Sequence, residues 1–141
     1  MTWTLTISGS LCVCITAVML LHSSPTTAHP KTEVTAPTIV NIAHKRLGTS
    51  YRITCKVNPG GLKDETMVYW LADGHFLEEV YKNINVTKTE KKSNDGTEYL
   101  HTKVVFTDLS QKDFHTNFTC IAMNPAGFAK ENVRIKKVTR R

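Results

Sequence analysis

The chain has 141 residues and a net charge of +6, which leaves room for a single domain of ordinary size. Its histidines are scattered without metal-ligand spacing, and it has no Gly-rich phosphate loop and no Gly-x-Ser-x-Gly elbow. We therefore expect neither an enzyme nor a metal or cofactor site. Nucleic acid is not an expected partner either, because aromatic and basic residues do not interleave into a stacking platform.

The N-terminus predicts a signal peptide over residues 1–28. Residues 5–21 carry no charge, and Ala28 suits cleavage before His29. A signal anchor is the alternative, but this apolar run is short for a membrane span and lacks basic flanks. Cleavage would remove Cys12 and Cys14 and would leave one cysteine pair in a secreted, extracellular chain without a membrane span.

Residues 29–37 predict an extended leader, because Pro30 and Pro37 stand among scattered threonines. Alternating runs after it predict an all-β domain over residues 38–138 and a basic tail over residues 139–141. Strands are expected at 38–44, 50–57, 66–72, 75–81, 97–108, 116–123 and 128–138, with a further short one at 86–91.

Cys55, Trp70 and Cys120 give the fold its clearest signature, a tryptophan framed by two cysteines. This spacing is typical of a single immunoglobulin-like β-sandwich, in which one disulfide joins the two sheets over the indole. Such a bridge would stabilise the fold by roughly 2 to 4 kcal/mol through its effect on the unfolded chain. Phe118 stands where many immunoglobulin domains have a corner tyrosine, so that hydroxyl is absent.

Strand alternation predicts different outer faces for the two sheets. With Cys55 inward, the outward residues of its strand are polar and predict an ordinary solvated surface: Arg52, Thr54 and Lys56. With Trp70 and Cys120 inward, the outward residues of the opposite sheet are mostly apolar: Met67, Tyr69, Leu71, Ile121 and Met123. A broad apolar patch on a small domain predicts a partner surface.

Asp73-Gly74 is a preferred two-residue turn and predicts a tight hairpin between 66–72 and 75–81. Residues whose numbers sum to 147 would then pair on the outer face: Leu71 with Phe76, Tyr69 with Glu78, and Met67 with Val80. Tyr69 and Phe76 are the expected anchors. The alternatives are a homodimer seam, cover by the leader, and a Glu78 that merely faces Lys82 or Lys88.

Two sequons, at Asn85 and Asn117, predict N-glycosylation on a secretory route. The C-terminal segment is strongly basic, and its cluster predicts either binding of sulfated glycosaminoglycans or a solubilising edge. The glycosaminoglycan candidates are Arg134, Lys136, Lys137, Arg140 and Arg141.

Two segments of the chain carry a family resemblance: the run from Tyr69 to Val80, Tyr-Trp-Leu-Ala-Asp-Gly-His-Phe-Leu-Glu-Glu-Val, and the run His-Thr-Asn-Phe-Thr-Cys at 115–120. Together they resemble the secreted interleukin-18-binding proteins of mammals and poxviruses. The resemblance implies a decoy that captures interleukin-18, denies it to its receptor and blocks interferon-gamma induction. It implies Phe76 and Glu78 as principal contacts, supported by Tyr69. The expected site also includes Met67, Leu71, Glu79 and Val80 from the same strand and hairpin.

The chain departs from that family at a few positions. Relatives often have His in place of Glu79, and poxviral relatives have an aromatic residue in place of Met67. Mammalian members have additional cysteines, so the single mature pair suggests a viral copy for immune evasion. The runner-up interpretation is an adhesion module that pairs through its apolar outer face.

Overall fold

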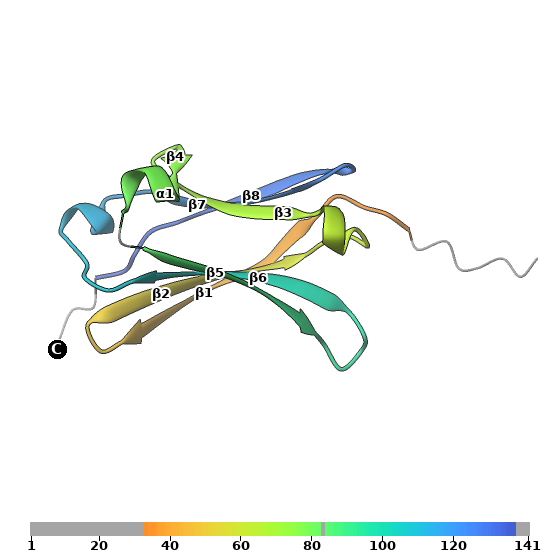
Figure 1. Ribbon diagram of the computed structural model, residues 1–141, viewed down its shortest axis with the longest axis horizontal. Coiled ribbons are helices and arrows are strands. Elements are labelled where there is room, and N and C mark those ends of the chain that lie inside the picture. The colour runs from red at the N-terminus through yellow and green to blue at the C-terminus, as the bar shows by residue number, and fades with distance from the viewer. Residues whose placement is uncertain (1–32, 83, 138–141) are drawn as a thin grey trace, which may run out of the picture. The chain divides into compact units, whose positions relative to one another are not determined.

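Two four-stranded antiparallel sheets pack face to face in the computed structural model, which describes residues 33–82 and 84–137 (Figure 1). Sheet A has the order β1 (Thr38–Leu47), β2 (Ser50–Asn58), β6 (Glu98–Phe106) and β5 (Asn85–Lys92). Sheet B has the order β4 (His75–Phe76), β3 (Met67–Ala72), β7 (Phe118–Asn124) and β8 (Gly127–Val133). Three short helices connect them: η1 (Lys63–Glu65), α1 (Leu77–Val80) and η2 (Lys112–Phe114). The predicted all-β sandwich is confirmed.

The core forms where the inward positions of both sheets meet. Along β2 every second side chain is buried, and the residues between them are partly exposed. The disulfide between Cys55 of β2 and Cys120 of β7 joins the sheets, with 6.5 Å between the two Cα atoms. Trp70 lies beside Cys120 in the register of β3 and β7 and is 2% exposed. The predicted Cys-Trp-Cys core is therefore confirmed.

Most predicted strands agree with the observed ones to within a few residues. The short strand expected at 86–91 is a full edge strand, β5, which pairs with β6 along its whole length. The last strand was expected to reach residue 138 but ends at Val133. Beyond it, Ile135 is 3% exposed and continues the core without strand pairing.

The strand predicted over 75–81 is wrong. It has only two residues, His75 and Phe76, and the helix α1 follows at once. Leu77, Val80 and Tyr81 are apolar at the i, i+3, i+4 spacing of a helix, and Leu77 is completely buried. The amide of Tyr81 donates a hydrogen bond of 2.9 Å to the carbonyl of Leu77, which closes the helical turn.

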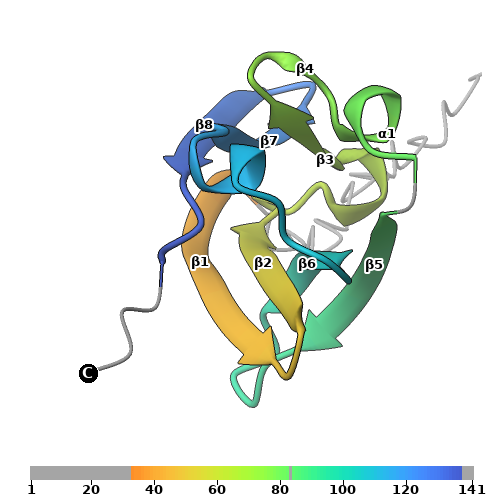
Figure 2. The same ribbon diagram turned by 90° about the vertical axis from the view of Figure 1, so that its left-hand side faces the viewer.

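The hairpin turn itself is as predicted. Asp73 and Gly74 have φ angles of 50° and 88°, the left-handed values that a type I′ turn requires. Leu71 pairs with Phe76, as the sum of 147 predicted. The further predicted pairs, Tyr69 with Glu78 and Met67 with Val80, do not form, because the chain has already turned into α1 (Figure 2).

The described part of the leader, residues 33–37, lies against the sandwich. The amide of Thr35 donates to the carbonyl of Gly60 at 3.0 Å, and the Asn124 side-chain amide donates to the carbonyl of Thr35 at 3.0 Å. Pro37 is fully buried. The predicted signal peptide, the first part of the leader and the tail at 139–141 lie outside the described residues. No helix among the described residues is long and apolar enough to cross a membrane.

Candidate binding face

The outer face of sheet B is built from three rows of side chains that the strand register aligns. One row runs through Met67, Met123 and Phe128, and the next through Tyr69, Ile121 and Lys130. The third row begins on β4 and runs through Phe76, Leu71, Thr119 and Asn132. We call the apolar members of these rows the apolar face: Met67, Tyr69, Leu71, Phe76, Ile121, Met123 and Phe128.

The apolar face is exposed at its margins and partly covered at its centre. Phe128 is 68% exposed, Met67 62% and Phe76 51%. Tyr69, Leu71 and Ile121 are partly buried between them and form the floor of the patch. Large apolar side chains that gather on neighbouring strands indicate a surface for a partner, whereas scattered ones do not.

Tyr69 and Phe76 are in contact although they stand in different rows. Their ring centroids lie 5.5 Å apart and their planes are inclined by 43°. Phe76 reaches this position because the tight turn places it opposite Leu71, next to Tyr69 on the outer face of β3. The structure thus brings together the two residues that the sequence predicted as anchors.

The acidic residues of the predicted site lie on α1 and not on a strand. Glu78 and Glu79 follow Phe76 directly and are exposed, because the helix buries only Leu77. Val80, also predicted at the site, is 38% exposed. Among residues 33–82 and 84–137 no ion pair involves Glu78, and its side chain is exposed, so the alternative of a solvated surface carboxylate stays open.

Phe128 is the member of the apolar face that sequence reasoning missed. It is the most exposed large apolar side chain in the described part of the chain, and it lies opposite Met123 across the β7–β8 turn. Pairing around that turn, with residue numbers that sum to 251, would have placed it there. Next to the face, Thr119 donates a 2.7 Å hydrogen bond to the Asn132 side chain, which gives the patch a polar border.

One sequon begins on a strand of sheet A, and the other begins just before a strand of sheet B. Asn85 is exposed at the start of β5, and Asn117 lies beside the hairpin turn. The Asn117 amide donates to the Asp73 carboxylate at 2.8 Å, and the Asp73 amide donates to the Asn117 carbonyl at 2.9 Å. Glycosylation at both positions stays a prediction, and at Asn117 a glycan would stand beside the hairpin that carries Phe76.

The C-terminal basic segment is only partly described. Arg134, Lys136 and Lys137 are exposed, and the ammonium of Lys137 lies 5.5 Å from the ring centroid of Phe114. Arg140 and Arg141 lie outside the described residues. Binding of a glycosaminoglycan by this segment therefore remains a prediction.

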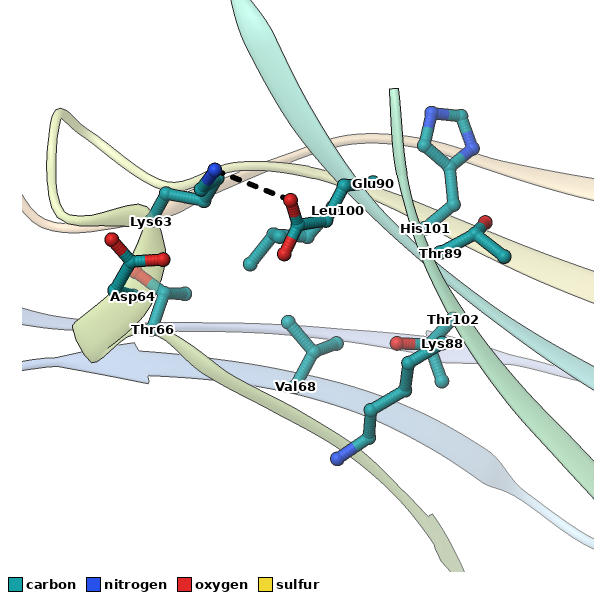
Figure 3. A pocket seen from close by; sticks show the side chains of 10 residues that line it. All are labelled: Lys63, Asp64, Thr66, Val68, Lys88, Thr89, Glu90, Leu100, His101 and Thr102. Carbon is teal, nitrogen blue, oxygen red and sulfur yellow. Dashed lines mark ion pairs between the residues drawn. The ribbon is translucent and has the colours of Figure 1, made fainter. Parts of the chain in front are cut away.

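A pocket of about 310 Å³ opens between the sheets at the β5 side of the sandwich (Figure 3). Glu90 and Glu98 lie 3.2 and 3.5 Å from the ammonium of Lys63, and these carboxylates raise the pKa of that lysine. Among the described residues, no three His, Cys, Asp or Glu side chains gather as metal ligands would. Lys63 and Glu90, which form one of these ion pairs, line the pocket, and the apolar face is the stronger candidate site.

These features define an immunoglobulin-like module with an exposed apolar face on one sheet. The chain belongs to the YLDV-IL18BP-like family, described as Yaba-Like Disease Virus IL18BP, whose model matches residues 39–138. This agrees with the family resemblance inferred from the Tyr69–Val80 run, and it agrees with the prediction of a binding protein that is not an enzyme.

Curated relatives include the interleukin-1 receptor type 2 of several mammals. The mouse receptor is 28% identical over 128 residues, which are 89% of this chain and 31% of the receptor. The human receptor is 27% identical over 115 residues, 77% of this chain and 29% of the receptor. The chain thus spans about a third of the length of these relatives.

Among solved structures, the ectodomain of mouse nectin-like molecule 4 matches with a TM-score of 0.54 and 15% identity. The match covers 71% of this chain and 33% of that one. At this identity the likeness shows the immunoglobulin-like fold and nothing about partners.

Proposed function

We propose that this chain is a secreted decoy that binds interleukin-18 through the apolar face and thereby denies the cytokine to its receptor. Membership of a family described as IL18BP supports a cytokine partner, and so does similarity to interleukin-1 receptor type 2. Export through the signal peptide at 1–28 and an origin as a viral copy are parts of the same proposal. The observation that carries it is the contact between Tyr69 and Phe76 on an exposed apolar surface.

The proposed mechanism is burial of an aromatic anchor next to a charged contact. Phe76 enters an apolar pocket of the cytokine, and Tyr69 packs against it and limits its rotamers. Large aromatic side chains bury much area at a low cost in side-chain entropy, so such a pair would supply most of the affinity. Truncation of one anchor would cost about 2 kcal/mol or more.

Glu78 and Glu79 supply the charge in this mechanism. Both carboxylates are exposed directly after the anchor, and neither has to leave an ion pair with another described residue when a partner binds. Glu78, two positions after Phe76, is proposed to pair with a Lys or Arg of the cytokine at the edge of the pocket. Removal of a charge that is desolvated in a complex chiefly accelerates dissociation.

The test is surface plasmon resonance of the secreted protein over immobilised interleukin-18, with interleukin-1β as the specificity control. Phe76→Ala is the anchor variant. Leu47→Ala is the matched control, because Leu47 is 42% exposed on the other sheet. We expect binding to interleukin-18 alone, lost in Phe76→Ala and kept in Leu47→Ala. An equal affinity of Phe76→Ala and parent would make the site assignment wrong.

A self-pairing adhesion module is the competing function, since the same apolar face could bury itself in a homodimer. That function predicts a dimer of the purified protein that Phe76→Glu dissociates. A decoy that uses this face for interleukin-18 predicts that the face stays free until the cytokine is added. Analytical ultracentrifugation of the parent and of Phe76→Glu, with and without interleukin-18, distinguishes the two.

A further inference from the structure

The outer face of sheet A carries five cationic residues and no carboxylate on the outward positions of its four strands. Each strand taken alone predicts an ordinary solvated surface, but the register places cations from all four strands on one face. We call these residues the basic face: Lys45 on β1, Arg52 and Lys56 on β2, Lys103 on β6 and Lys91 on β5.

The carboxylates of sheet A stand on the opposite side of the strands. Glu90 and Glu98 alternate with the outward residues Lys91 and Tyr99, and both lie within 3.5 Å of the Lys63 ammonium. Figure 3 shows the Glu90 carboxylate turned toward Lys63, with the His101 ring pointing away from it. The carboxylates of this sheet thus interact with Lys63 on the far side of the strands and do not neutralise the basic face.

Three cations of the basic face act on a shared neighbour, His101. Burial, followed by the charges of Lys91, Lys56 and Lys103, holds the pKa of His101 below its usual value. Its imidazole therefore gains a positive charge less readily than a free histidine does. Within residues 33–82 and 84–137 no ion pair involves any of the five cations, so their charge is available to a ligand.

The basic face is elongated, because its cations follow a diagonal across the sheet. Lys45 and Arg52 are directly opposite each other in one row, Lys103 is in the next row, and Lys56 is in the third. Lys91 is one row further, on the edge strand β5. From β1 to β5 the stripe crosses three inter-strand spacings, and it also advances by three rows, each two residues along a strand. Its length is therefore roughly 25 Å. Such a stripe fits a linear polyanion better than a compact anion.

The chemistry of the basic face disfavours nucleobases. Tyr99, the tyrosine of this face, is covered by the Lys56 ammonium, which lies 3.7 Å from the ring centroid. Single-stranded nucleic acids need open aromatic rings for their bases to stack on, whereas a sulfated chain needs only cations along its path. The predicted export of the chain also favours an extracellular polyanion.

We propose that the basic face binds a linear sulfated polysaccharide. This site lies on the sheet opposite the apolar face, so a polysaccharide could retain the protein at a cell surface while the apolar face engages a protein. It is also distinct from the C-terminal segment that the sequence predicted for this role. Asn85 is in the row of Arg52 but on β5, at the corner away from the diagonal, where a glycan would border the stripe.

The test is retention of the full secreted protein on immobilised heparin under a NaCl gradient. The face variant is Arg52→Gln/Lys56→Gln/Lys103→Gln. A matched control, Lys82→Gln/Lys112→Gln/Lys130→Gln, removes the same charge from exposed positions elsewhere. A tail variant, Arg134→Gln/Lys136→Gln/Lys137→Gln, tests the C-terminal segment. Thermal unfolding of each variant checks the fold, and Lys45→Gln/Lys91→Gln, at exposed edge positions, replaces the face variant if that one unfolds.

We expect the face variant to elute at a clearly lower NaCl concentration than either the control or the tail variant. The slope of log affinity against log salt should fall by about one for each cation removed from the site. Elution of the face variant together with the matched control would overturn the proposal. A larger shift in the tail variant would overturn it too, because it would move the site to the C-terminus.

Two further ligands test the choice of polyanion. Fully desulfated heparin should bind at least tenfold more weakly than heparin, because the sulfates supply the charge that the stripe matches. A single-stranded DNA oligonucleotide of equal charge should compete poorly. Equal competition by the oligonucleotide would overturn the assignment to a polysaccharide. None of these measurements involves a cytokine, so the result is independent of the proposed decoy function.

Discussion

The hydroxyl of Tyr81 donates a hydrogen bond of 2.6 Å to the carboxylate of Asp113, across 32 positions of the sequence. Asp113 is only 4% exposed, and its other oxygen accepts from the amide and the hydroxyl of Ser110. The Tyr81 ring packs against Phe106 and Phe118. Tyr81, directly after α1, thus supplies the hydroxyl that is absent at the corner position of Phe118. Its hydrogen bond to Asp113 fixes the segment that carries Glu78 and Glu79.

Removal of this hydroxyl should weaken the fold. In Tyr81→Phe the ring contacts remain, but one oxygen of the buried Asp113 loses its donor, so the free energy of unfolding should fall by about 1 to 3 kcal/mol. Urea unfolding measures the change. Tyr99→Phe is the matched control, because Tyr99 is partly exposed on the outer face of sheet A and should change by less than about 0.5 kcal/mol. Equal effects of the two substitutions would contradict the assigned role.

The same hydrogen bond makes stability depend on alkaline pH. Burial, and then the hydrogen bond to Asp113, raises the pKa of Tyr81 from the ordinary 10.0 to about 12. Between these two values the unfolded chain loses the proton and the folded chain keeps it, so stability falls as pH rises through this window. Below pH 10 the contribution of Tyr81 is complete. A phenolate absorbance titration should show one late step that Tyr81→Phe removes, and survival of that step in the variant would reassign it.

Sequence reasoning succeeded where the two-residue alternation of a strand decides which side chains face the core. Cys55, Trp70 and Cys120 each fix which side of a strand faces the core, and alternation then orients every other residue of that strand. It failed at 75–81, because the helical spacing of Leu77, Val80 and Tyr81 was read as a strand that continued the hairpin. A tertiary contact decides that segment: Leu77 fills the core and thereby ends β4 after two residues.

The two faces differ in how far the sequence could predict them. Most of the apolar face follows from single strands, but Phe128 requires the β7–β8 register. The basic face requires the strand order of sheet A, because Lys103 and Lys91 become neighbours of the β2 cations only when β6 lies between β2 and β5. That order is not visible in any local pattern of the chain.

Gly60 should be much less tolerant of substitution than Gly48, although both have positive φ angles of 65° and 63°. A Cβ atom at Gly60 would overlap the carbonyl oxygen of Thr35, whereas at Gly48 it would meet open space. Gly48→Ala should therefore lower the free energy of unfolding by about 1 kcal/mol, through backbone strain alone. Gly60→Ala should lower it by more, because it also displaces the leader segment. Thermal unfolding compares them, and equal losses would mean that Thr35 moves aside freely.

The two glutamates of α1 should affect interleukin-18 binding through different rate constants if the proposed complex forms. Glu78→Gln should raise the dissociation rate, because this carboxylate is proposed to be desolvated against a cytokine cation. Glu79→Gln should lower the association rate and weaken its dependence on salt, as substitution of a charge at the rim does. Surface plasmon resonance at two salt concentrations separates these effects. An effect of Glu78→Gln on association alone would place Glu78 at the rim.

A double-mutant cycle tests whether Tyr69 and Phe76 act as one anchor. Their rings touch, so the losses of interleukin-18 affinity in Tyr69→Ala and Phe76→Ala should not add, and the coupling energy should be about 0.5 to 1.5 kcal/mol. Phe128 serves as the control partner, because it lies three strands from Phe76, roughly 14 Å across the sheet. The cycle of Phe76→Ala with Phe128→Ala should be additive within about 0.5 kcal/mol. Additivity in the Tyr69 cycle would mean that the two rings, although in contact, engage the cytokine independently.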